Sequence, residues 1–346
     1  MSRFLQLHVL TFYPPSNLNR DDTGRPKTAV IGGTTRLRVS SQSLKRAWRT
    51  SDVFGSALAG HLASRTQRLG EMLQADLVKA GVGPDKAKAA ARTVAGVFGK
   101  LKPETDKNPT RIEQLAFISP AERDAALDLA RRVAAGEKSA VVPADLLQRA
   151  DTAADLAMFG RMLADNPDYN FEAAVQVAHA ITTHPVPVED DFYTAVDDLK
   201  VPSEDAGAGF IGEQGFGSGV FYLYACVDKA LLLKNLGGDK ALRATAIAAL
   251  VEAAATVSPG GKQASFASRA RAHYLLAECG DAQPRTLAGA FTKAIRDEDP
   301  LAGSVARLQA WRAALDAAYA DDGQSQAEMV VGGAGTLAAV LAFSQA

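Results

Sequence analysis

Hydrophobic and polar positions alternate over residues 4–12, where Leu5, Leu7 and Val9 share one face. A period of two residues is typical of a strand that buries one face. Prolines then end the pattern, and a polar loop with several glycines is expected to continue to Gly33. The chain is therefore predicted to begin with a strand of a sheet.

A second alternation, over residues 35–40, predicts another strand with Arg36 and Arg38 on its polar face. Ser40 or Ser41 follows and offers a side-chain oxygen that can cap a helix beginning at the next residues. The free backbone N–H groups of a helix N-terminus suit an anion such as a phosphate. This strand–helix junction is thus a candidate phosphate-binding geometry.

A helical period dominates the chain from about residue 55 to 180. Amphipathic segments are expected near residues 57–80, 84–99, 111–135 and 143–164, and an apolar helix is expected to end near Ile181. A helical block of this length is too long for a simple crossover between two strands. We therefore predict a helical subdomain inserted into a sheet-based domain.

Acidic and then glycine-rich residues over 190–219 precede a run with strong strand propensity, Val220–Val227. An Ala-rich helix over 239–257, a strand over 272–279 and two or three further helices complete the pattern. Without the insertion, the order is strand, helix, strand, strand, helix, strand. This is the ferredoxin-like, or split βαβ, arrangement, which is also the framework of the RNA-recognition motif. The predicted fold class is α+β.

Positive charge is concentrated at the start of the chain. The first fifty residues contain nine basic and two acidic side chains, a net charge of +7; because the whole chain has a net charge of −1, the remainder carries −8. Such a segregation indicates a surface that meets a polyanion. We interpret the chain as a nucleic-acid-binding protein.

Three of these basic residues, Lys45, Arg46 and Arg49, can project from adjoining faces of one short helix. They occupy its first turns, where the helix dipole disfavours cations by a few tenths of a kcal/mol each. A bound anion would reverse this cost, and Ser40 and Gln42 add hydroxyl and amide donors for phosphate and ribose. A basic helix face that meets only solvent is the alternative. The clustering with the other basic residues of the segment favours nucleic-acid contact.

Two glycine-rich segments have a superficial similarity to nucleotide-binding motifs. Gly207–Gly212 has the spacing G-x-G-x-x-G, but it follows acidic residues and precedes strand-forming ones, so a loop tip is expected. Phe210 and Phe216 on this arm can wedge against bases or dock on a neighbouring subunit. Ser258–Gln263 lacks the P-loop spacing, and either a plain turn or a turn lying against RNA explains it.

No catalytic or metal-binding constellation emerges from the sequence. His179 and His184 are five residues apart, which does not place two ligands on one helix face, so structural hydrogen bonding is favoured. Asp21 and Asp22 form a carboxylate pair in a loop, for which solubility or pairing with Arg20 is the simpler explanation. No nucleophile–base signature such as G-x-S-x-G is present.

Cys226 and Cys279 lie in apolar surroundings and are expected to be buried free thiols, which suits a reducing cytoplasm. No uncharged apolar run reaches the length of about 18 residues that a membrane span needs. The N-terminal segment also has no signal-peptide core. We expect a cytoplasmic protein without membrane contact.

Six short segments occur in an order that is specific to one family. They are Leu7–Leu10, Ser16–Asp22, Arg38–Ala47, His179–His184, Phe192–Leu199 and Ser218–Tyr222. Together these segments, which extend over most of the chain, closely resemble the backbone subunit of the type I-E CRISPR Cascade complex, the CasC family.

The resemblance implies a hand-shaped protein with an RNA-recognition-motif-like (ferredoxin-like) palm, an inserted helical fingers domain and a β-hairpin thumb. The palm would comprise residues 1–54, 181–227 and 228–346, the last with the C-terminal helices, and the fingers would comprise residues 55–180. The thumb would be a hairpin at about 190–219 that reaches the adjacent copy and folds over the RNA.

The resemblance and the basic strand–helix junction together yield candidate contact residues. Those for RNA are Arg20, Lys27, Arg38, Ser40, Gln42, Lys45, Arg46, Arg49, Met162, Phe210, Phe216, Lys262 and Gln263. Met162 would lie at the fingers, where bases are displaced. Candidates for contact with the target-DNA backbone are Arg131, Arg132 and Lys138, and the helical part has fewer basic residues than the family would lead us to expect.

The expected function is that of a non-catalytic scaffold that needs neither a metal nor another cofactor. Copies of the chain, about six head to tail, would bind one CRISPR RNA together with other Cascade subunits. The assembly would present the guide for pairing with target double-stranded DNA. Such a subunit binds phosphate and sugar and leaves the base edges free.

Two alternatives stay open. Related backbone subunits of other CRISPR types cleave target RNA with a loop aspartate and a metal, and Asp21 or Asp22 would take that role here. A generic ribosome-like RNA-binding protein would instead be a stable monomer without a self-association arm.

Overall fold

Two compact units make up the chain. The computed structural model describes residues 2–137, 146–147, 150–163, 165–195, 198, 210–321 and 323–346. The first unit, here the sheet unit, comprises Met1–Phe54, Val177–Cys226 and Ala248–Ala346. The second, the helical unit, comprises Gly55–Gln176 and Val227–Ile247.

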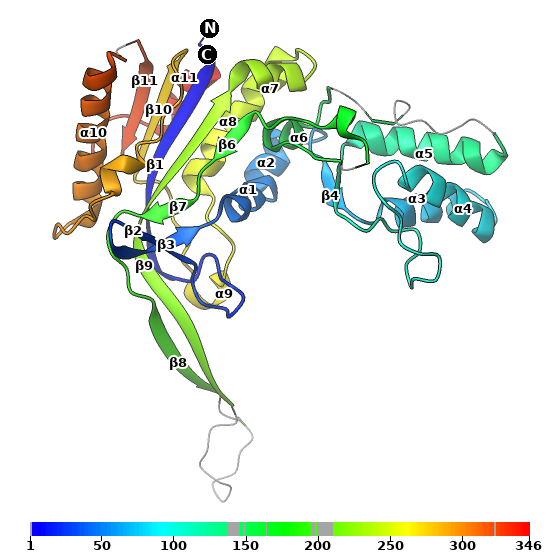
Figure 1. Cartoon of the computed structure of the whole chain (residues 1–346), viewed down its shortest axis with the longest axis horizontal. Coiled ribbons are helices and arrows are strands. Elements are labelled where there is room, and N and C mark those ends of the chain that lie inside the picture. Colours follow the sequence, from blue (N-terminus) through cyan, green and yellow to red (C-terminus); the bar gives the residue numbers. More distant parts are fainter. Residues whose placement is uncertain are drawn as a thin grey trace, which may run out of the picture. The chain divides into compact units, whose positions relative to one another are not determined.

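The sheet unit is built on one sheet with the strand order β11-β10-β1-β9-β7-β3-β2 (Figure 1). The strands are β1 (Phe4–Ser16), β2 (Thr28–Ile31), β3 (Thr34–Val39), β7 (Ala180–Thr182), β9 (Phe210–Asp228), β10 (Tyr274–Gly280) and β11 (Ser325–Val330). The pairs β1–β10, β10–β11, β2–β3, β3–β7 and β7–β9 are antiparallel. The protein is thus mixed α+β with an antiparallel sheet, which confirms the predicted class at this level.

Helices accompany this sheet along the chain. The helices of the sheet unit are α1 (Ser41–Arg49), α9 (Gln263–Phe266), η3 (Ala288–Phe291), α10 (Pro300–Tyr319) and α11 (Leu337–Gln345). Two other helices cross the boundary between the units, α2 (Asp52–Ala57) and α8 (Lys240–Thr256). The Ser40 side chain accepts a hydrogen bond from the Ser43 N–H at the start of α1, which confirms the predicted cap. Leu44 and Trp48 are the buried residues of this helix.

Both faces of β1 are buried, whereas its alternation predicted only one. Leu10 lies on the same face of the strand as Gln6 and His8 and belongs to a core cluster with Phe291 and Leu308. These two residues come from η3 and α10, and Figure 1 shows α10 packed along this side of the sheet. The polar face therefore meets protein and not water.

His8 is part of a buried polar network. The Tyr222 hydroxyl accepts from the Leu287 N–H (2.9 Å) and contacts His8 Nδ1 (2.9 Å). Because the Glu278 carboxylate can only accept, a neutral His8 carries its proton on Nε2, and its Nδ1 accepts from the Tyr222 hydroxyl. His8 Nε2–H then donates to Glu278 Oε2 (3.1 Å), which also accepts from Arg285 (3.1 Å). Burial lowers the pKa of His8. Burial alone would raise the pKa of Glu278, but the hydrogen bonds from His8 and Arg285 hold it at about 2.

A β-hairpin extends from the sheet at the start of β9 (Figure 1). Strand β8 (Glu189–Ala195) pairs antiparallel with β9, with Glu189 opposite Phe216 and Ala195 opposite Phe210. Every residue of β8 is exposed. Of the predicted G-x-G-x-x-G segment, residues 207–209 lie outside the described residues, and residues 210–212 belong to β9.

The helical unit has its own core. Its elements are β4 (Ser64–Thr66), α3 (Leu69–Lys79), α4 (Pro84–Ala95), β5 (Ala116–Ile118), α5 (Pro120–Ala135), α6 (Ala154–Phe159), η2 (Pro167–Tyr169) and α7 (Lys229–Asn235), with β6 (Val175–Val177) at the boundary. Leu73, Val94 and Leu129 join α3, α4 and α5 in one buried cluster. Arg161 and Glu122 form a fully buried ion pair at 2.6 Å.

Several predicted helical stretches are strands. The segment 57–80 contains β4, which pairs with β5 at the start of the segment 111–135. The helix expected to end near Ile181 is replaced by β6 and β7. β-Branched residues are frequent there, and they favour a strand that is buried in the sheet.

Two further strands, β2 and β11, were also absent from the sequence prediction. Residues Thr28–Ile31, assigned to a loop, form β2, which pairs with β3. Gly32 and Gly33 turn the chain between them with φ of +58° and +72°, which is the two-residue turn that glycine pairs favour. At the other edge of the sheet, Ser325–Val330 form β11, although the sequence predicted only helices in the C-terminal region.

Cys226 and Cys279 are buried thiols that form no disulfide, as predicted. Within the described ranges, no helix has both the length and the apolar character needed to cross a membrane.

Candidate nucleic-acid interface

The loop between β1 and β2 is tied to both of its structural neighbours. Asn17 is completely buried, and its Nδ2 donates to the carbonyls of Gly24 (3.0 Å) and Gly215 (2.9 Å). Asn19 Oδ1 accepts from the N–H of Ser40 (2.9 Å), the residue that caps α1. The loop therefore connects the first turn of α1 to β9 at the base of the hairpin.

Asp21 stabilises the turn of this loop. Its Oδ1 accepts from the Thr23 hydroxyl (2.7 Å), the Thr23 N–H (2.9 Å) and the Arg25 N–H (3.0 Å). The hydrogen bond from the Thr23 side chain is the main cause that lowers the pKa of Asp21. No group of three or more His, Cys, Asp or Glu side chains that could hold a metal occurs within the described parts of the chain.

The glycine-rich loop after α8 lies directly against the β1–β2 loop. A Cβ atom on Gly261 would collide with the carbonyl oxygen of Leu18, so only glycine permits this approach. Gln263 Nε2 donates to the Pro259 carbonyl (2.9 Å), and Phe266 packs on Phe216 with ring centroids 6.0 Å apart. Two segments that are about 240 residues apart in sequence thus form one surface.

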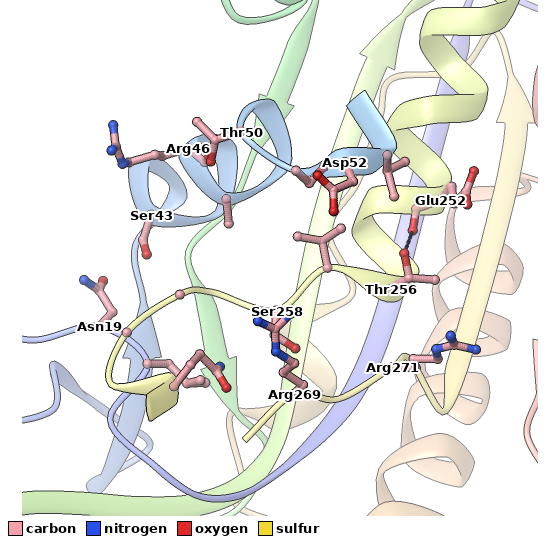
Figure 2. A pocket seen from close by; sticks show the side chains of 18 of the residues that line it. Asn19, Ser43, Arg46, Thr50, Asp52, Glu252, Thr256, Ser258, Arg269 and Arg271 are labelled. Carbon is pink, nitrogen blue, oxygen red and sulfur yellow. Dashed lines mark hydrogen bonds between the residues drawn. The ribbon is translucent and has the colours of Figure 1, made fainter. Parts of the chain in front are cut away.

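A pocket of about 1020 Å³ lies in this surface, entirely within the sheet unit (Figure 2). Its basic lining residues are Arg20, Arg46, Arg269 and Arg271. Its acidic ones are Asp21, Asp52 and Glu252, and Figure 2 shows Asp52 and Glu252 near α2 and α8 while Arg46 projects from α1 away from them. Arg46 therefore offers its charge to a polyanion on the side away from these two acids.

A second pocket, of about 570 Å³, adjoins the base of the hairpin. Arg20 lines both pockets, and Arg25, Lys262 and Tyr193 line the second. Arg25 is already paired with Asp190 of the hairpin, at 2.8 Å.

The structure gives the basic residues of the first fifty positions different surroundings. Arg36, predicted to face the polar side of its strand, is completely buried and donates to the carbonyls of Thr182 (2.9 Å) and Phe291 (3.1 Å). It therefore holds the fold and cannot contact RNA. Its neighbour Arg38 is half-buried, and its Nη1 donates to His179 Nδ1 (2.7 Å), which agrees with the structural role expected for that histidine.

The other predicted RNA-binding residues of the sheet unit fall into three classes of exposure. Exposed residues are Arg20, Gln42, Arg46, Phe210 and Lys262; half-buried ones are Lys27, Lys45, Arg49, Phe216 and Gln263; Ser40 is buried. Burial lowers the pKa of Lys45. Ser40 uses its hydroxyl to cap α1 and Gln263 uses its Nε2 within the loop, so in both cases a polar group already serves the fold.

The remaining candidates lie in the helical unit. Met162 is 82% exposed. Arg131 and Arg132 are exposed on α5, and they pair with Asp128 (3.2 Å) and Glu137 (2.8 Å) respectively. Lys138 lies outside the described residues.

Sequence reasoning missed Arg269 and Arg271, which line the main pocket together with Arg20 and Arg46. A signal was present, since Ser268–Ala272 alternates small and basic residues directly before a strand. Asn17 was also missed, and no local pattern marks it, because both of its partners are backbone carbonyls.

Comparisons with known proteins identify the family of the chain. Residues 5–342 match the model of a family described as CT1975-like protein. The chain belongs to the CT1975-like protein family. This CT1975-like chain is also similar to a chain of a solved structure described as a CRISPR RNA-guided surveillance complex, pre-nicking. The TM-score is 0.85 and the identity 32%, over 97% of this chain and 95% of that one.

A chain of another CRISPR RNA-guided surveillance complex has a TM-score of 0.62 and 27% identity to this CT1975-like chain, over 97% of this chain and 92% of that one. No curated protein matches the chain. The CT1975-like chain is thus a close structural match to subunits of CRISPR surveillance complexes, and the predicted relation to CRISPR complexes is confirmed at this level.

Proposed function

We propose that this protein is a non-catalytic backbone subunit of a CRISPR RNA-guided surveillance complex, which holds the guide by its phosphates and riboses. The observation that carries the proposal is the convergence of Arg20, Arg46, Arg269 and Arg271 on one pocket. Three separate segments supply these arginines, so a run of charge along one helix does not account for them. Guanidinium groups bind phosphate through paired hydrogen bonds without reading a base.

The strand order also supports an RNA-recognition-motif-like palm. Strands β10, β1, β9 and β7 are neighbours in that order, and along the chain they are fourth, first, third and second of the set. This is the order of a split βαβ sheet. The helical unit then corresponds to the fingers and the β8–β9 hairpin to the thumb.

Copies are proposed to assemble head to tail along CRISPR RNA, with other Cascade subunits, in a type I-E complex that presents the guide to double-stranded DNA. The exposed hairpin is acidic near its base, at Glu189, Asp190 and Asp191, whereas the palm is basic. An acidic and a basic surface on the same subunit favour heterologous contacts between copies, which generate helical arrays.

Nothing in the described structure favours the ribonuclease alternative. Asp21 Oδ1 already accepts three hydrogen bonds within its turn. Asp22, the other candidate, is exposed next to it. We therefore assign no cleavage step to either aspartate.

The proposal is tested by RNA binding of a Lys45→Ala/Arg46→Ala variant across a range of salt concentrations. Loss of two phosphate contacts should reduce the slope of log affinity against log salt by about 1.4, at roughly 0.7 per contact for a single strand. The matched control is Arg131→Ala/Arg132→Ala, which removes two adjacent cations that α5 already pairs with acids. Unchanged affinity and slope in the Lys45/Arg46 variant would contradict the proposal.

A further inference from the structure

The segment between α9 and β10 holds two arginines on a pinned backbone. Its side chains alternate, with Ser268 and Ala272 buried and Arg269 and Arg271 exposed. The two arginines are therefore both exposed, about 7 Å apart along an extended chain.

Hydrogen bonds fix this segment at Ala270, between the arginines, and at Ala272, directly after them. The Ser258 hydroxyl accepts from the Ala270 N–H (2.8 Å) and donates to the Ala270 carbonyl (3.0 Å). The Ala272 N–H donates to the Ala255 carbonyl at the end of α8 (2.7 Å). The positions of the two arginines are therefore set by the fold, as a binding site requires.

Neither guanidinium has a hydrogen-bond or ion-pair partner among the residues that the structure describes. Other arginines do: Arg111 contacts Glu71 (2.6 Å), and Arg285 contacts Asp316 (2.6 Å). A guanidinium has five donors and keeps its charge at every physiological pH. Two of them without acidic partners, on one side of a pocket, form a site for an anion with repeated charges.

The other side of the same pocket is formed by Arg20, from the β1–β2 loop, and by Arg46. Arg46 and Arg49 lie in the last turn of α1, because the helix ends at Arg49, so the expectation that they occupy its first turns is wrong, and the helix dipole favours cations there. Figure 2 shows Arg46 and Arg271 at opposite ends of the pocket, with Arg269 between them in this view and Asp52 and Glu252 near α2 and α8. A strand that entered here would meet cations from the β1–β2 loop, from α1 and from the segment before β10. The acids disfavour a path along α2 and α8.

We infer that Arg269 and Arg271 form a second phosphate-binding wall, so that the single-stranded guide is held from two sides across the pocket. This inference rests on the proposed function and adds to it a site that lies more than 200 residues from the basic N-terminal segment. Bidentate contacts from both walls fix the path of the sugar–phosphate chain and leave its bases free.

The test compares RNA affinity across salt for Arg269→Ala/Arg271→Ala and for a control, Lys293→Ala/Arg307→Ala. The control removes the same charge from exposed positions that do not line the pocket. We expect the salt slope to fall by about 1.4 in the first variant and by less than about 0.3 in the control. Arg269→Lys/Arg271→Lys retains both charges and should keep most of the slope.

The possible outcomes distinguish a failure of this inference from a failure of the proposed function. If Lys45→Ala/Arg46→Ala weakens RNA binding and the Arg269/Arg271 variant behaves like its control, the second wall is wrong and the proposed function stands. If neither variant affects binding, both are wrong. Because both arginines are exposed, the melting temperature should not change, and a variant that melts early is replaced by Arg269→Gln/Arg271→Gln.

Discussion

Arginines of the main pocket and arginines of α5 illustrate two ways in which a protein can place positive charge. In the pocket, Arg20 and Arg46 come from different elements and have no hydrogen-bond or ion-pair partner for their side chains among the described residues. On α5, Arg131 and Arg132 are adjacent, and each contacts an acid within five positions along the chain, Asp128 or Glu137. Both pairs add two charges to the sequence, but only in the second pair is each charge matched by a contacting acid.

The comparison teaches that the density of basic residues is a weak guide to a binding surface. An arginine that contacts an acid a few positions away along the chain has its charge largely balanced, although such an exposed pair adds little stability. An arginine that the fold brings to a pocket from another segment has donors to offer. The nearest acid in space, and not the number of cations in a window of sequence, distinguishes the two regions.

Arg36 and Arg38 allow the largest test of this distinction, because they are two positions apart on β3. Arg36→Ala would leave the buried carbonyls of Thr182 and Phe291 without a donor, and should lower the free energy of unfolding by about 2–4 kcal/mol. Arg38→Ala should change it by less than about 0.5 kcal/mol and weaken RNA binding instead. Thermal and denaturant unfolding measure the first effect. Equal stability of the two variants would show that burial does not separate their roles.

Acid should weaken the sheet and leave the charge of the pocket arginines unchanged. Folding lowers the pKa of both His8 and Glu278, so the stability they contribute is present at neutral pH and is lost as the pH falls. The loss should begin below pH 6.5 for His8 and continue from about 4.5 toward 2 for Glu278, by roughly 1–3 kcal/mol in total. Melting temperatures across this range test it. A His8→Asn variant should show a flatter profile between pH 6.5 and 5; a melting temperature that rises on acidification would contradict the sign.

Releasing the α5 arginines from their acids should have the smallest effect. In Asp128→Asn/Glu137→Gln the two guanidiniums lose their partners, and the stability should fall by less than about 1 kcal/mol. Non-specific RNA affinity should rise by about twofold at low salt, because α5 then has unbalanced charge. The same double change measured at high salt is the control. No change at low salt would mean that pairing does not limit the availability of these arginines.

Local patterns predicted the local parts of the fold. The alternation of β1 and β3 and the Ser40 cap of α1 depend on neighbouring residues, and the sequence contains those neighbours. The burial of Arg36 and His8 depends on η3 and α10, which follow more than 250 residues later. No pattern within β1 or β3 could have shown that these elements cover their polar faces.

The residues of the candidate site also divide into those that local sequence patterns predicted and those that distant segments bring together. The cations of α1 were found from their spacing on one helix. Arg269 and Arg271 join them only because Gly261 allows the loop after α8 to touch Leu18, a contact between distant segments. The strand β2 is the exception, because the Gly32-Gly33 pair between two β-prone runs is a hairpin signal that could have been recognised.

The mass of the particles that form on RNAs of increasing length tests the central claim most directly. A subunit that holds the guide by its backbone should bind RNAs of unrelated sequence alike, and the protein mass should rise in steps of one 36.3 kDa chain as the RNA lengthens. Without RNA the chain should not form such a series. A single protein mass on every RNA, or steps that appear with only one sequence, would contradict the account.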